Sequence, residues 1–250
     1  MKSDTLTLKP FLAGTGRVET HAQGWRLCLP TAGRQVYSDA QLDDYGSPPP
    51  RSFPHRPPAR FTIKARFSGR DLLGTAGFGL WNHPFAPGSG LPRLPRALWF
   101  FYASPPSNMA LAVGVPGFGW KAAVIDATRP SALALAPFAP LLVLLNRSKW
   151  WFSRLWPIVQ RGLRIYEAPL PGELLPEWHT YSIEWEIDRA RLRLDDRLVL
   201  ETDRPPQGSM GFVAWIDNQY AVVTPQGKVR FGLLDSPYPQ WLEIKKPDGP

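Results

Sequence analysis

The alternation of apolar and polar residues is clearest between residues 177 and 196. Tyr181, Ile183 and Trp185 occupy every second position there, with polar residues between them. A period of two, with aromatic and β-branched residues on one side, is typical of a half-buried β-strand. Two shorter runs follow after turns, so the pattern predicts a meander of antiparallel strands.

Other segments show related patterns. The segment 61–67 alternates cleanly, and 74–82 is a glycine-rich strand where a backbone or a ligand can approach closely. The segment 97–103 is apolar at every position, which is typical of a central strand. Further strands are expected at 25–29, 36–37, 109–113, 210–223, 229–234 and 240–244.

The segment 131–166 departs from the strand pattern. Its first half is almost wholly apolar, and the apolar residues of its second half recur at helical spacing. Arg147, Arg154 and Arg161 repeat every seven residues on another face. We expect one or two helices, ended or kinked at Pro157. The apolar run is shorter than the roughly 20 residues that cross a bilayer.

Composition agrees with an all-β fold. The chain has 250 residues, of which 29 are Pro and 21 are Gly, and this suits many short strands joined by tight turns. A β-sandwich of this length is often one domain. We therefore expect a two-sheet antiparallel β-sandwich over residues 1–250, with an apolar and basic helical insert at 131–166.

The formal net charge of +8 raises the question of a nucleic-acid partner. The sequence has no zinc-finger spacing, recognition-helix pattern or RNA-binding signature, so we expect no nucleic acid. Cys28 is the only cysteine, and the first residues have no apolar signal core. We expect a cytoplasmic protein, with a position peripheral to a membrane as the alternative.

One phrase resembles a known family. The run Glu177-Trp-His-Thr-Tyr-Ser-Ile-Glu-Trp185 is similar to the Phe-His-Thr-Tyr-x-Ile-x-Trp phrase of family 16 glycoside hydrolases. Residues 60–67 resemble that family's Gly-x-x-Glu-x-Arg-x-Lys strand, and 77–81 its Gly-x-x-Pro-Ala-Phe-Trp strand. The order of the three matches is the family's. The resemblance implies a concanavalin A-like jelly roll of two sheets, with a cleft on the concave face.

The sequence departs from that family at the strand which carries its catalytic Glu-x-Asp-x-x-Glu. The strand in that place here, residues 98–103, holds no carboxylate. Retaining glycosidases need two carboxyl groups about 5 Å apart. We therefore expect a hollow that keeps an aromatic lining and lacks the acidic pair.

Asp217 is the candidate catalytic residue, because it interrupts the apolar strand 211–216. A polar group there costs free energy unless it has partners or lines a cleft, so a hydrogen bond to a neighbouring loop is the structural alternative. A turn or capping role is the alternative for the loop residues among the other candidates. The candidate ligand-binding residues are Asp43, Tyr45, Trp81, Asn82, His83, Trp99, Phe101, Tyr102, Trp215, Asn218, Gln219 and Tyr220.

Metal and cofactor motifs are missing from the sequence. The four histidines are scattered, with no pair at ligand spacing, and neither a phosphate-binding loop nor a dinucleotide fingerprint occurs. We expect no metal and no cofactor, while calcium on the convex side stays open.

Three functions remain possible at this point. The first is binding of a glycan or an apolar ring compound in an aromatic cleft. The second is an enzyme other than a glycosidase, of cyclase, isomerase or hydratase type, with Asp217 as acid or base for an apolar small molecule.

The third function is attachment to a membrane surface through 131–166. This segment holds five cations and no acids, together with Trp150, Trp151 and Trp156. The alternative is a helix packed on the sandwich with its arginines in water. A membrane helix would leave its apolar face exposed, and a packed helix would bury it.

Overall fold

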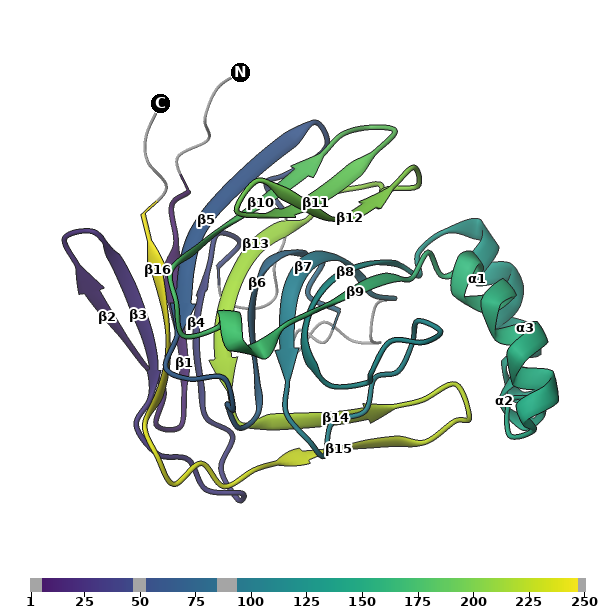
Figure 1. Cartoon of the computed structure of the whole chain (residues 1–250), viewed down its shortest axis with the longest axis horizontal. Helices are drawn as coiled ribbons and strands as arrows, with labels where there is room; N and C mark the ends of the chain where they lie inside the picture. The colour runs from purple at the N-terminus through teal and green to yellow at the C-terminus, as the bar shows by residue number, and fades with distance from the viewer. Residues whose placement is uncertain (1–5, 47–52, 85–93, 247–250) are drawn as a thin grey trace.

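The computed structural model describes residues 6–46, 53–84 and 94–246, and they form two antiparallel sheets of seven strands each (Figure 1). In spatial order the first sheet contains β1 (Lys9–Ala13), β4 (Asp39–Asp43), β13 (Gly211–Asp217), β6 (Thr75–Trp81), β7 (Arg96–Ala103), β8 (Gly119–Asp126) and β9 (Tyr166–Leu170). The second sheet contains β12 (Arg197–Thr202), β11 (Ala190–Leu194), β10 (His179–Trp185), β5 (Ala59–Phe67), β16 (Gln240–Lys245), β3 (Gly24–Leu29) and β2 (Arg17–His21). The predicted two-sheet jelly roll is confirmed.

The main core lies between the sheets. Alternate residues of each strand point inward, and Phe78, Phe100 and Tyr181 meet there with ring centroids 4.9 Å apart between Tyr181 and each Phe. Trp185 is fully buried. Burying each such side chain contributes roughly 1.5–3 kcal/mol, so the alternation seen in the sequence is also the main source of cohesion between the sheets.

The strand predicted at 210–223 is divided in two. β13 ends at Asp217, and β14 (Gln219–Val223) leaves the first sheet to pair with β15 (Val229–Leu233). The buried Asn218 side chain makes this break. Its amide donates to three backbone carbonyls of other segments, and its oxygen accepts from the Ser38 N–H at 3.0 Å.

Two predicted strands are wrong. Residues 36–37 lead into β4 without strand pairing, and 109–113 form an irregular loop. Side chains, and not strand pairing, satisfy the backbone of this loop. The Ala112 N–H donates to the Glu167 carboxylate, and the Val113 N–H donates to the Gln160 side-chain oxygen. Apolar composition alone therefore does not separate a covered loop from a strand.

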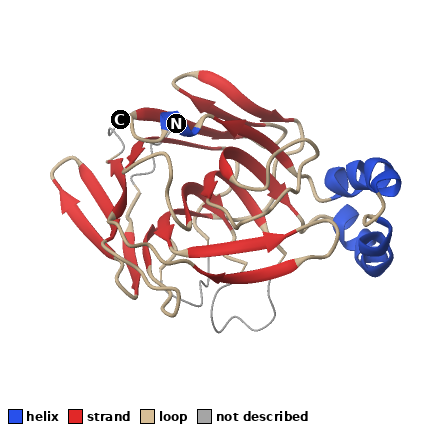
Figure 2. Cartoon of the chain, turned by 60° about the horizontal axis from the view of Figure 1, so that its bottom comes forward, coloured by secondary structure: helices blue, strands red, loops and turns tan. Residues whose placement is uncertain are grey.

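The helical insert around 131–166 is confirmed, and it joins β8 to β9 (Figure 2). It consists of α1 (Pro130–Leu135), a 3-10 turn η1 (Ala136–Phe138), α2 (Ala139–Leu145) and α3 (Lys149–Gly162). A further 3-10 turn, η2 (Gly172–Leu174), follows β9. Pro157 lies inside α3 and does not end it. Among the described residues, no helix is long and apolar enough to cross a membrane.

Candidate functional site

The outer face of the first sheet, which turns away from the second sheet, carries most of the predicted site. Strand register places its outward residues in rows. Trp215 of β13 is opposite Gly77 of β6, which is opposite Phe101 of β7. The next row brings Gly79 beside Trp99. Because side chains alternate along a strand, the core residues between these positions point the other way.

Six aromatic rings gather on this outer face, and we call them the aromatic face: Tyr45, Trp81, His83, Trp99, Phe101 and Trp215. His83 stacks on Trp81 with centroids 4.7 Å apart, and Trp81 lies parallel to Trp215 at 6.4 Å. Trp99 stacks on Phe101 at 5.3 Å. Trp81 and Trp99 are half-buried. The rings therefore form a second apolar cluster, separate from the main core.

Two glycines make room for these rings. A Cβ atom added at Gly77 would lie 3.0 Å from Cη2 of Trp215, and one added at Gly79 would lie 2.7 Å from Cβ of Trp99. The same Cβ atoms would lie still closer to the β7 backbone, 2.3 Å from the Phe100 carbonyl oxygen at Gly77 and 2.4 Å from the Leu98 carbonyl oxygen at Gly79. The sequence predicts a close approach to this glycine-rich strand, and the neighbouring β7 backbone makes it, together with the side chains of Trp215 and Trp99.

Hydrogen bonds fix the rim of the aromatic face. The Trp81 indole N–H donates to the Tyr45 hydroxyl at 2.7 Å. Asp43 accepts from the N–H groups of Tyr45 and Gly46 and from the Gln41 amide. Burial raises the pKa of Asp43 above its usual value, and these donors oppose the shift. Asp43 therefore fixes the turn that presents Tyr45.

A pair of buried carboxyl groups lies at the other end of the same face. Asp39 of β4 is directly opposite Asp217 of β13, and both side chains point outward because Ala40 and Ile216 face the core. They are 2% and 5% exposed. The sequence patterns predict no acidic pair on this face, so the pairing of Asp39 with Asp217 is a finding of the structure.

The environment favours a protonated form of this pair. Burial raises the pKa of Asp217 to about 7, although hydrogen bonds from Gln219 and Thr75 oppose the shift. Burial raises the pKa of Asp39 well above its usual value, and the neighbouring Asp217 charge raises it further. Two coupled carboxyl groups lose their two protons in separate steps, and the pKa of each step belongs to the pair and not to one residue. At neutral pH the pair can therefore hold a proton and give it up.

Specific contacts link the pair to the aromatic face. The Trp215 indole donates to the Thr75 hydroxyl at 3.0 Å, and this hydroxyl donates to Oδ1 of Asp217 at 2.9 Å. Asp39 forms a hydrogen bond with Tyr37, while its buried Oδ1 has no partner among the described residues. The Thr75 hydroxyl thus links the Trp215 side chain to the Asp217 carboxyl.

The remaining candidates lie elsewhere. Tyr102 points into the main core, where its hydroxyl donates to the Leu72 carbonyl at 3.1 Å. Asn218 is fully buried and shapes the break between β13 and β14. Gln219 is exposed, and Tyr220 lies on β14 under the Arg230 guanidinium. The structure therefore brings Tyr45, Trp81, His83, Trp99, Phe101 and Trp215 together, with Asp43 and Asp217 beside them.

Asp39, Gln41 and Thr75 were missed. The run Asp39-Ala40-Gln41-Leu42-Asp43 alternates polar and apolar residues, so a period-two search over five residues would have found it. The polar positions all face outward here. Thr75 gives no comparable signal, because a single hydroxyl at a strand start is common.

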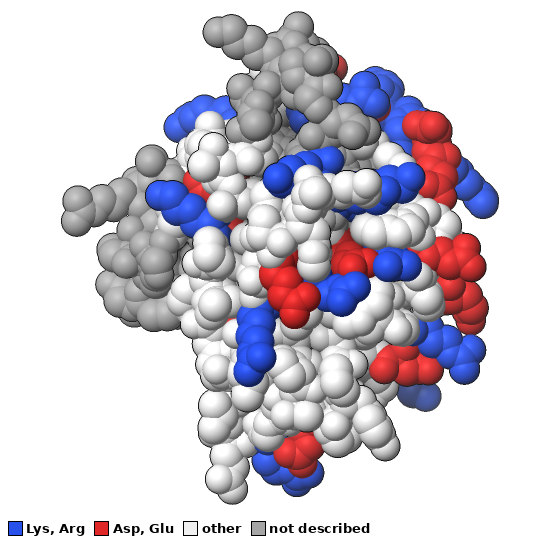
Figure 3. Space-filling view, turned by 90° about the vertical axis from the view of Figure 1, so that its left-hand side faces the viewer, with Lys and Arg blue, Asp and Glu red and all other residues white. Residues whose placement is uncertain are grey.

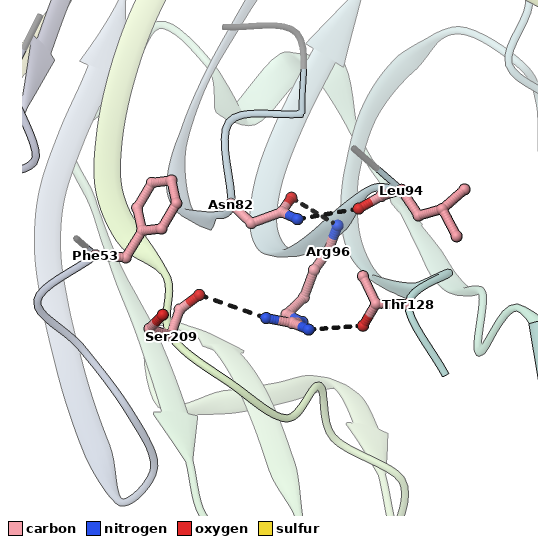
Figure 4. A pocket seen from close by; sticks show the side chains of 6 residues that line it. All are labelled: Phe53, Asn82, Leu94, Arg96, Thr128 and Ser209. Atoms are coloured by element: carbon pink, nitrogen blue, oxygen red, sulfur yellow. Dashed lines mark hydrogen bonds between the residues drawn. The ribbon is translucent and has the colours of Figure 1, made fainter. Parts of the chain in front are cut away.

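A pocket of about 400 Å³ opens at the end of the strands opposite the carboxyl pair (Figure 4). It is lined by Phe53, Asn82, Leu94, Arg96, Thr128 and Ser209. The Asn82 amide is committed to the backbone of Leu94 and Arg96. The Arg96 guanidinium is held by Thr128 and by the fully buried Asp126. Because Asn82 and Arg96 are committed to these contacts, the pocket walls have a structural role.

We looked for side chains that could together bind a metal ion. Among the described residues, no group of three His, Cys, Asp or Glu side chains is arranged to hold a metal ion. The expected lack of a metal and a cofactor stays a prediction.

The chain is a two-sheet antiparallel jelly roll with an aromatic surface on the outer face of one sheet. No family model and no curated protein matches the chain in sequence. Solved structures are similar to it at low identity. A laminarinase from Flavobacterium sp. UMI-01 is 12% identical over 97% of this chain and 92% of that chain, with a TM-score of 0.49.

Two further structures are similar to a comparable extent. A glycoside hydrolase family protein from Mycobacterium thermorestibile is 10% identical over 97% of this chain and 92% of that chain, with a TM-score of 0.49. A Bacteroides ovatus family 16 enzyme in complex with a glucan product is 11% identical over 92% of this chain and 83% of that chain, with a TM-score of 0.47. The likeness is one of fold.

Proposed function

We propose that the aromatic face binds a glycan, or another compound with a flat apolar ring. The observation that supports this most strongly is the placement of six aromatic rings on the outer side of a sheet, outside the main core. Aromatic side chains combine a large apolar surface with a polar edge, so they suit ligands that are both ring-shaped and hydroxylated.

The geometry suggests how such a ligand would lie. The half-buried rings of Trp81 and Trp99 offer apolar surface, while the neighbouring Tyr45 hydroxyl accepts from the Trp81 indole and can orient a polar group. Outward residues of β7 are Ala97, Trp99, Phe101 and Ala103, so this central strand offers stacking surface and no carboxylate. This arrangement supports binding more than cleavage of a glycosidic bond at β7.

The test is a glycan array followed by calorimetry on each ligand found. We expect Trp99→Ala to raise the Kd by about tenfold or more, as for a central aromatic contact. Trp178→Ala is the matched control, since Trp178 is half-buried like Trp99 and lies off the aromatic face, beside the Arg66 guanidinium. Equal losses in both variants, or unchanged binding in Trp99→Ala, would contradict the proposal.

A second function is supported by the carboxyl pair. We infer that Asp39 and Asp217 could move a proton in an isomerisation, cyclisation or hydration of a ligand held on the aromatic face. Their opposed positions and the raised pKa of both groups support this. With one proton between them, one carboxyl would act as acid and the other as base.

This second function needs a substrate first. On a compound that binds and is turned over, Asp217→Asn should lower kcat by about 10²–10⁴ while changing the Kd little. Asp203→Asn is the control, because its side chain is 83% exposed. Turnover that survives Asp217→Asn would remove Asp217 from the reaction and leave the binding function intact.

A further inference from the structure

The helical insert exposes an unusual amount of apolar surface. Seven large apolar side chains within 131–162 are between 39% and 59% exposed: Leu133, Phe138, Leu141, Leu144, Trp150, Trp151 and Ile158. We call this set the apolar surface of the insert. Single exposed apolar residues are common on proteins, but a group of this size on one small element marks an interaction site.

The insert is attached to the sandwich by another face. In α3, Trp156 and Val159 are buried, and the Trp156 indole donates to the Leu111 carbonyl at 2.8 Å. At about 100° per residue, Trp151 and Ile158 share a side of α3 that is roughly a third of a turn from Trp156 and Val159. The exposed residues of α3 therefore point away from the contact with the sandwich.

A second contact holds α2. The buried Asn146 amide donates to the Pro225 carbonyl at 3.2 Å, and Val143 packs against Gly227 in the turn between β14 and β15. The insert is thus braced at two points and projects beyond β8 and β9 at one end of the molecule (Figures 1 and 2). A projecting apolar surface suits insertion into the headgroup region of a lipid bilayer more than docking into a groove of another protein.

The charge of the insert is of one sign. Arg147, Lys149, Arg154, Arg161 and Arg164 lie between residues 131 and 166, and no Asp or Glu does. The Arg154 guanidinium lies over the Trp150 ring at 4.5 Å. Arginine beside tryptophan and aliphatic side chains is the composition of helices that lie in the headgroup region of anionic bilayers.

We propose that the insert binds the surface of an anionic lipid bilayer. Its apolar surface would enter the headgroup region, and its cations would contact lipid phosphates and carboxylates. The buried Trp156 lies outside the contact, which corrects its assignment to a lipid interface together with Trp150 and Trp151. The insert would then lie between the bilayer surface and the sandwich.

Vesicle flotation of the full chain tests this. We expect it to float with vesicles of phosphatidylcholine and phosphatidylserine, and to bind vesicles of phosphatidylcholine alone about tenfold more weakly. The triple variant Phe138→Ser, Leu141→Ser, Leu144→Ser should lose binding to both. Its control is Leu12→Ser with Tyr238→Ser, since these two residues are also exposed and belong neither to the insert nor to the β14–β15 hairpin that contacts it.

A charge variant separates the two contributions. Arg147→Gln, Arg154→Gln and Arg161→Gln together should remove most of the preference for phosphatidylserine, while Arg70→Gln with Arg204→Gln, also exposed, should not. Circular dichroism of every variant verifies folding. No flotation with the anionic vesicles would overturn the proposal. So would a wild-type dimer in sedimentation that the triple variant dissociates, because a second copy would then cover the apolar surface.

Discussion

The outer faces of the two sheets both carry tryptophan, but they surround it differently. On the first sheet, aromatic rings contact one another beside glycines, and among the described residues no ion pair reaches Asp39 or Asp217. On the second sheet, the Arg66 guanidinium lies 4.9 Å from the Trp178 ring and 5.3 Å from the Trp241 ring. The neighbours of a tryptophan, more than its presence, therefore indicate a binding surface.

Charge on the second sheet is locally balanced. Glu243 accepts from the Nε–H of Arg26 at 2.8 Å and from that of Arg66 at 2.7 Å. Figure 3, which looks at the left-hand side of Figure 1, shows cations and acids side by side on that part of the surface. The polar groups there satisfy one another, whereas those of Asp39 and Asp217 depend on burial and hydroxyl contacts.

The largest expected effect on stability comes from replacing Gly79, a β6 glycine that lies beside Trp99 of the aromatic face. A Cβ atom at Gly79 would lie 2.4 Å from the Leu98 carbonyl oxygen and 2.6 Å from Cα of Trp99, and the φ of +151° is itself strained for a side-chain-bearing residue, so Gly79→Val forces β6 or β7 to shift. We expect a loss of about 3 kcal/mol in the free energy of unfolding, measured in urea. The matched change Gly33→Val, where no atom lies within 4 Å, should change it by less than about 0.5 kcal/mol. Similar losses at both positions would show that crowding is not the cause.

The next effect is a pH dependence that comes from the first sheet alone. Because folding raises the pKa of Asp217 from 3.8 to about 7, the folded state retains a proton that the unfolded state releases. The free energy of unfolding should therefore fall as pH rises from about 4 to 7, by up to about 1.4 kcal/mol per unit.

Asp217→Asn tests this directly. The variant should flatten the slope and should be more stable than the wild type at pH 8, since its neutral amide oxygen can still accept from Thr75. Asp203→Asn, with an exposed side chain, should keep the wild-type slope. An unchanged slope in Asp217→Asn would show that its carboxyl titrates normally.

The smallest effect belongs to the second sheet and has the opposite sign. Burial opposes the shift, but hydrogen bonds from Arg66 and Arg26 lower the pKa of Glu243 overall. This contribution is present above pH 4.5, the ordinary pKa of Glu, and is lost as pH falls further. Glu243→Gln should cost about 1 kcal/mol at pH 7 and less at pH 3, in thermal unfolding at each pH. A cost that does not change with pH would point to packing rather than charge.

Sequence reasoning predicted the fold better than the site. The strands at 61–67 and 181–185 were predictable because strict alternation allows one burial pattern only. The aromatic face was partly predictable, since rings at alternate positions of 97–103 must fall on both sides of that strand. Which side faces the core depends on pairing, and that is why Tyr102 was grouped with Phe101 although the two point in opposite directions.

The carboxyl pair could not have been predicted from local pattern. Asp39 and Asp217 are far apart in sequence and meet only because β4 pairs with β13 in one register. A shift by one residue would turn Asp217 toward the core. The end of β13 was equally hidden, because the polar run 217–219 gives no sign that Asn218 is buried and bridges two loops, the one before β4 and the one after β15.

The hairpin formed by β14 and β15 has a mechanical consequence. It begins two residues after Asp217, and the far turn that joins its strands rests on the insert through Pro225 and Asn146. At the other end of the hairpin, the Gln219 N–H donates to the Asp217 carboxyl at 2.9 Å. One two-stranded element therefore contacts both the insert and the carboxyl pair, so a substitution that displaces this hairpin would disturb both regions.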